Sequence, residues 1–186
     1  MTIWEITHPR MNEVSPLVRT AEDMQNPHFQ KQFGGDGSKL QWLKRPKLTV
    51  KVEKGKKKQK QKPRSDVSPF TAPGLVFNDK VRGALGDFLR KFGQVLEIEV
   101  DDGVEYYYNV TQVVPCIDEG RSEKYPEGSI AKAVFDESKL PAEPLVFIDP
   151  LMRGSIYVND SAKAELERLI QQANITGMAF EQVRSH

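Results

Sequence analysis

Acidic residues at alternating positions are the first candidates for chemistry in this sequence. Glu97, Glu99 and Asp101 alternate with apolar residues, and Asp102 follows just before Gly103. A period of two places the carboxylates on one face of a strand, and the Asp-Gly pair predicts a hairpin turn. Such oxygen ligands could bind a divalent cation, although acids at this spacing usually form the wet side of a strand. The acidic face can therefore be interpreted either as a binding surface or as a face that is only solvated.

A run of tyrosines follows across the predicted hairpin. Residues 106–108 are all tyrosine, so at least one of them shares the outer face with the carboxylates. Acids around an exposed tyrosine are typical of a protein-binding surface, and Tyr107 joins the four acids as a predicted partner contact. The alternative is that the tyrosines are present for their β propensity alone.

The segment 54–64 is rich in lysine and has no large apolar side chain to bury. We therefore expect a mobile loop that folding does not require. Positive charge alone can bind phosphate groups, so nucleic-acid binding is an alternative function for this segment. No aromatic residue interleaves to stack on bases, which favours a solvated loop. The residues that would contact nucleic acid are Lys56, Lys57, Lys58, Lys60 and Lys62.

Other catalytic patterns are weak. The sequence has no paired Cys and His set with metal-ligand spacing, and its glycine-rich residues 34–37 lack the lysine of a phosphate-binding loop. Cys116 with the distant His8 or His28 could act as nucleophile and base, but a lone cysteine is more often a small buried hydrophobe. We therefore expect no enzyme activity, no metal and no cofactor.

Composition indicates a soluble chain of one domain. The 186 residues are 38% hydrophobic and 28% charged, and no apolar run approaches the roughly 20 residues that cross a bilayer. A single cysteine and the lack of a secretory signal predict a cytoplasmic protein that does not bind membranes. The net charge of +1 hides a segregation, because residues 44–64 hold 11 basic residues and one acid. The remainder has 16 basic and 25 acidic residues, a net charge of −9.

The clearest local pattern lies near the C-terminus. Residues 155–158 are typical of a short strand, and the Asn159-Asp160 pair can begin the helix predicted over residues 161–172. Leu169 is expected at the centre of the buried face, and Gly177 is expected to end this segment before an extended run. The apolar stripe of the helix is Leu166, Leu169, Ile170 and Ala173.

The same order of elements occurs earlier in the chain. A strand over residues 74–77 precedes Asn78-Asp79, a helix is predicted over residues 80–92, and Gly93 closes it before a strand over residues 95–100. Internal duplication and coincidence both stay open, because Asn-Asp is a common helix start.

Together these elements predict an α+β fold, with a mostly antiparallel sheet and two packed helices. Residues 121–128 are expected to be a charged loop. Residues 1–46 are interpreted as an accessory segment, and residues 47–186 as the domain. The remaining strands are predicted over residues 3–6, 47–53, 104–114, 130–135 and 145–148.

By these motifs the chain resembles a bacterial immunity-protein family, found beside polymorphic-toxin and type VI secretion effector genes and catalogued as a domain of unknown function. The resemblance implies a partner encoded next door, a cognate toxin or effector that the protein binds and neutralises in interbacterial competition. It brings no catalytic residues. This chain departs from the family's pattern in its lysine run and in the Asn-Asp pairs that replace a helix-starting serine. The matching segments are residues 75–79 with the helix to 89, 107–110, 156–160 and 175–180.

Overall fold

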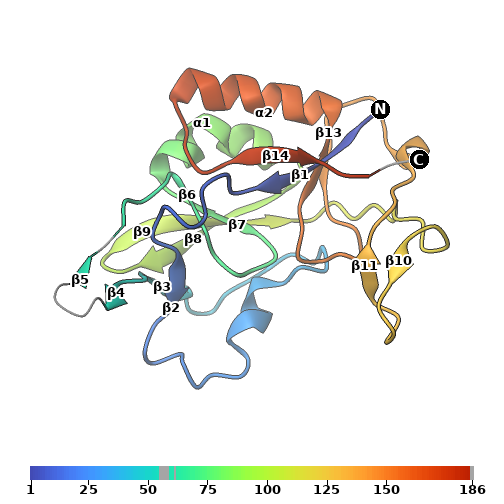
Figure 1. Cartoon of the computed structure of the whole chain (residues 1–186). Coiled ribbons are helices and arrows are strands. Elements are labelled where there is room, and N and C mark those ends of the chain that lie inside the picture. Colours follow the sequence, from blue (N-terminus) through green and yellow to red (C-terminus); the bar gives the residue numbers. More distant parts are fainter. Residues whose placement is uncertain (55–58, 61, 185–186) are drawn as a thin grey trace.

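The computed structural model describes residues 1–54, 59–60 and 62–184, and it confirms an α+β fold with two α-helices and mostly antiparallel sheets (Figure 1). Among these residues no helix has the length and apolar character that a membrane crossing requires.

The first sheet has four antiparallel strands, with the N-terminal strand in its interior. In order they are β12 (Val146–Phe147), β13 (Tyr157–Asn159), β1 (Ile3–Thr7) and β14 (Ala179–Gln182). The sequence suggested that residues 1–46 are an accessory segment. They are not, because β1 pairs with both β13 and β14. A central strand cannot be removed without leaving two rows of unpaired backbone groups.

The second sheet has six strands and is antiparallel except where β3 runs parallel to β8. Its long hairpin pairs residues Gly93 to Val110 without interruption around a two-residue turn, Asp101-Asp102. In order the strands are β2 (Leu17–Arg19), β3 (Lys47–Val50), β8 (Gly93–Val100), β9 (Gly103–Val110), β7 (Leu75–Phe77) and β6 (Val67–Ser68).

Two small hairpins stand apart from these sheets. β4 (Glu53–Lys54) pairs with β5 (Gln59–Lys60), and β10 (Glu123–Lys124) pairs with β11 (Ile130–Lys132). The charged loop expected at residues 121–128 is therefore largely a hairpin, which projects from the body in Figure 1. Short 3-10 helices occupy Phe29–Phe33 and Glu137–Lys139.

Both predicted helices are present, and an asparagine caps each one. The helix α1 spans Asp79–Leu89 and α2 spans Asp160–Ala173. The Asn78 side chain accepts from the Val81 amide, and Asn159 accepts from the Ala162 amide, so each satisfies a free donor of the first turn. The glycines do not end these helices. Arg90 ends α1, and Asn174 ends α2 with a left-handed φ of 50°.

The two strand–helix–strand units share one arrangement. β9 lies between β7 and β8 and is antiparallel to both, as β1 lies between β13 and β14. The two helices contact each other above the strands (Figure 1). One core joins the units, because it contains Phe77 and Val81 together with Val158 and Leu166.

Details at the two helix starts also match. The Tyr106 hydroxyl on β9 donates to Asp79 at 3.2 Å, and the indole of Trp4 on β1 donates to Asp160 at 2.9 Å. A basic residue three positions after each aspartate lies over the same ring, Arg82 in the first unit and Lys163 in the second. This shared geometry supports duplication over coincidence.

Candidate functional site

The acidic end of the β8–β9 hairpin is exposed, as its alternating pattern predicted. Glu97 and Glu99 lie on the face opposite to Ile98, which is fully buried. The turn residues Asp101 and Asp102 are also exposed, and Asp101 adopts a φ of 50°. The acids therefore lie together at one end of a paired and registered hairpin.

Neighbouring segments hold this hairpin in place. The Glu99 amide donates to the Pro46 carbonyl at 3.0 Å, and the Thr49 hydroxyl donates to Asp101 at 2.5 Å. Arg45 forms an ion pair with Glu97. Among the described residues, none forms an ion pair or hydrogen bond with the side chain of Glu99 or Asp102, so these carboxylates are available for a partner.

The prediction that Tyr107 contacts a partner is wrong. Tyr107 is fully buried, and its hydroxyl donates to the Phe33 carbonyl at 2.7 Å. The reason is that the N-terminal segment covers the second face of the sheet, where the Phe33 ring packs edge-on against Tyr107 at 5.1 Å. Burial raises the pKa of Tyr107 far above its ordinary value. The tyrosine that shares the acidic face is Tyr106, which pairs with Glu97 across the hairpin.

The basic segment is only partly described. Lys56, Lys57 and Lys58 lie outside the described residues, and Lys60 belongs to the short strand β5. The Lys62 ammonium donates to the Asn12 carbonyl at 2.9 Å.

The end of that segment is not the loose loop that the sequence suggested. The Pro63 carbonyl accepts from the Ser15 amide at 3.0 Å. Arg64 forms an ion pair with Glu105 at 2.8 Å. Residues 62–64 are thus tied to the body.

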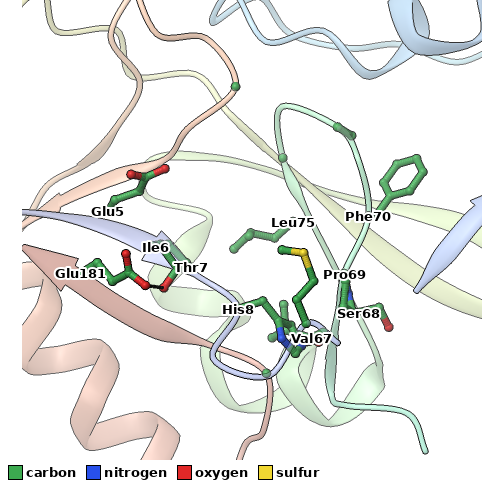
Figure 2. A pocket seen from close by; sticks show the side chains of 15 residues that line it. Glu5, Ile6, Thr7, His8, Val67, Ser68, Pro69, Phe70, Leu75 and Glu181 are labelled. Atoms are coloured by element: carbon green, nitrogen blue, oxygen red, sulfur yellow. Dashed lines mark hydrogen bonds between the residues drawn. The ribbon is translucent and has the colours of Figure 1, made fainter. Parts of the chain in front are cut away.

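A cleft of about 400 Å³ opens between the two sheets (Figure 2). Glu5 and Thr7 of β1 and Glu181 of β14 line one side, and Phe70 and Leu75 line the other. This site could not be predicted from the sequence, because its two halves are more than 60 residues apart and belong to different sheets, which only packing of one sheet on the other brings together. No local pattern signals it.

His8 closes one end of the cleft beside Ser65. The His8 Nε2 atom lies 2.9 Å from the Ser65 hydroxyl and 3.1 Å from the Val67 carbonyl. The Arg10 amide donates to Nδ1, so Nε2 must carry the proton and donate. A histidine in this tautomer cannot accept a proton from Ser65, whose hydroxyl instead donates to the Val67 carbonyl. Burial lowers the pKa of His8 and outweighs the hydrogen bond to the Val67 carbonyl, which raises it. The net shift favours the neutral ring. The pair is therefore structural and not a nucleophile with its base.

Cys116 is buried beside the buried carboxylate of Asp149. Burial, followed by the charge of Asp149, raises the pKa of the thiol to about 12. A thiol with this pKa stays protonated and is a poor nucleophile. Asp149 accepts from the Cys116 and Ile117 amides at 2.8 Å each, which explains its place in the core. Across the part of the chain described, no three His, Cys, Asp or Glu side chains are grouped to hold a metal ion.

In the comparisons with known proteins, no family model and no curated protein matches this chain.

Proposed function

We propose that this protein is an immunity protein, which binds a basic bacterial toxin or effector in the cytoplasm and blocks it. The observation that carries the proposal is the acidic end of the β8–β9 hairpin. Glu97, Glu99, Asp101 and Asp102 are exposed there, and the hairpin is fixed by pairing with β3 and β7. A fixed acidic surface attracts a positively charged partner and accelerates its association.

The candidate nucleophiles and bases of the sequence favour a binding function over catalysis. His8 is held in a tautomer that cannot activate Ser65, and Cys116 is buried. The family resemblance carries no catalytic residue either. A protein that acts by occupying a toxin needs a stable surface, which a hairpin within a six-stranded sheet provides.

The sequence outside residues 44–64 supports the same kind of partner. It carries 16 basic and 25 acidic residues, so the body is acidic although the whole chain is nearly neutral. Toxins that act on nucleic acid must themselves be basic to bind phosphate, and an acidic inhibitor then has complementary charge.

The experiment is capture of the product of the neighbouring gene from cell extract by tagged protein. Wild type should retain it, and the Glu97→Lys/Glu99→Lys variant should retain much less. The control is Glu22→Lys/Glu143→Lys, which changes the net charge equally at exposed acids elsewhere. Equal retention by all three proteins would exclude the hairpin as the docking surface.

The same proteins test the nucleic-acid alternative. A generic RNA duplex should show no salt-dependent binding to wild type at physiological ionic strength. Strong binding that falls steeply with salt, and that disappears when the lysines of residues 54–60 become glutamine, would favour the alternative.

A further inference from the structure

The cleft between the two sheets has an acidic side and an apolar side. Figure 2 shows Glu5 and Glu181 on the side formed by β1 and β14, with Phe70 across from them and Leu75 between. Its volume of about 400 Å³ lies within the range of binding sites for small groups. The cleft can therefore enclose a side chain with a polar end and an apolar stem.

Glu5 and Glu181 lie side by side in the cleft without a compensating cation among the described residues. Glu5 and Glu181 are register partners in the antiparallel β1–β14 pair, so their side chains leave the same face of the sheet. Each accepts a hydrogen bond from a neutral hydroxyl, Glu5 from Ser155 at 2.6 Å and Glu181 from Thr7 at 3.4 Å. No Lys or Arg lines the cleft, and within the described part of the chain neither glutamate forms an ion pair.

This pairing is unlike the other acidic positions in the sheets. On the long hairpin, Glu97 is opposite Tyr106 and Glu99 is opposite Val104. On the projecting hairpin, Glu123 is opposite Lys132 and forms an ion pair with it at 2.8 Å. Like charges directly opposite each other destabilise a sheet, so an added cation between Glu5 and Glu181 would be stabilising.

We propose that this cleft binds an arginine side chain presented by a basic protein partner. A guanidinium is planar and has five donors, so it can donate to two neighbouring carboxylates at once, whereas an ammonium is a compact point charge. The methylene stem of the arginine packs on the apolar side of the cleft, where Leu75 lies nearer to the glutamates than Phe70 does. Charge complementarity and the apolar wall together select this occupant.

This inference rests on the proposed function, since the partner supplies the arginine, but it concerns a second surface. The acidic hairpin steers the partner, and the cleft fixes one of its side chains. The two can fail separately. A cleft that does not bind arginine leaves the effect of the hairpin reversal unchanged.

The test uses the blocked tripeptide acetyl-Gly-Arg-Gly-amide as probe and its citrulline analogue as the neutral control. Amide chemical shifts of the labelled full-length protein are followed by NMR at low salt. The arginine peptide should shift the amides of Thr7, Leu75 and Gly177, and citrulline should not. Glu5→Gln/Glu181→Gln should weaken binding about tenfold, since charge-assisted hydrogen bonds are lost. Glu22→Gln/Glu143→Gln, with the same change in net charge, should bind as wild type does.

Three outcomes would overturn the proposal. One is the absence of shifts around the cleft at millimolar peptide, and a second is equal binding of the arginine and citrulline peptides. The third is spermidine binding as tightly as the arginine peptide, which would mean a site for small cations instead of a protein side chain. Both glutamine variants keep a hydrogen-bond acceptor at each substituted position, so we expect them to fold. Cooperative unfolding of each variant checks this.

Discussion

Tyr106 and Tyr107 are neighbours in sequence but have opposite environments, because successive residues of a strand point to opposite faces. Alternation predicted that one tyrosine would join the acids. Which one it is depends on the register of the hairpin, in which Glu97 is paired with Tyr106. Whether Tyr107 on the other face is buried depends on what covers that face. The covering side chains include Phe33 and Trp42, which lie more than 60 residues away in the chain. The acids themselves were predictable, since a carboxylate needs no distant partner to stay in water.

His8 shows a residue whose role only the folded structure reveals. Burial lowers the pKa of His8 in the folded protein, whereas the same histidine in the unfolded chain keeps the ordinary pKa of 6.5. The unfolded chain therefore binds a proton at His8 more readily than the folded protein does. The stability contributed by neutral His8 is therefore complete above pH 6.5 and is lost as the pH falls through 6.5 toward the folded-state pKa.

We accordingly expect the free energy of unfolding in urea to fall between pH 7.5 and 5.5 in wild type, and to fall less in His8→Gln. The exposed His28 provides the matched control, and His28→Gln should keep the wild-type dependence. A His8→Gln variant with an undiminished loss of stability would contradict the assignment of the neutral tautomer.

At the scale of elements, the two helices and most strands were predictable because their signals are local. An Asn-Asp start and an apolar stripe of period 3.6 lie within a dozen residues of each other. The phase of the stripe was less certain. Leu166 and Ala162 are buried in α2, whereas Leu169, the expected centre, is only partly buried. The helix packs on α1 as well as on the strands, which turns its buried face toward Leu166.

Three alanine substitutions in α2 test this orientation. Leu166→Ala should destabilise the protein by about 2 to 5 kcal/mol, because the side chain is fully buried. Leu169→Ala should have a smaller effect. Glu167→Ala should change stability by roughly 0.5 kcal/mol or less, because it removes only a surface ion pair with Lys163. Denaturant unfolding of the three variants measures the order, and a larger effect at Leu169 than at Leu166 would contradict it.

At the scale of the whole molecule, the position of β1 was the least predictable feature. Its strand character was evident, but pairing with β13 and β14 joins residues more than 150 positions apart, and no local pattern encodes such a contact. The termini consequently lie near each other, since the Val183 amide donates to the Ile3 carbonyl at 3.1 Å. In the first unit the equivalent strands β8 and β9 are joined directly by a hairpin turn.

If the second unit is a permuted copy of the first, its strands should also tolerate a direct connection. We expect a circular permutant that joins residue 186 to Met1 through a short glycine-rich linker, with new termini between Glu127 and Gly128, to fold. Its melting temperature should lie within about 5 °C of wild type. A permutant opened between Tyr107 and Tyr108 inside β9 should not unfold cooperatively. Loss of cooperative unfolding in the first permutant would contradict the equivalence of the two units.

The acidic end of the β8–β9 hairpin is the surface that we propose receives a basic protein partner. The most direct measurement is the association rate constant with the product of the neighbouring gene at two salt concentrations. It compares wild type, Glu97→Lys/Glu99→Lys and the charge-matched Glu22→Lys/Glu143→Lys. We expect the hairpin variant to associate more slowly, with a rate constant that depends less on salt, while the rate constant of the control stays close to that of wild type. Rates and salt dependence that are the same for the hairpin variant and the control would contradict this expectation.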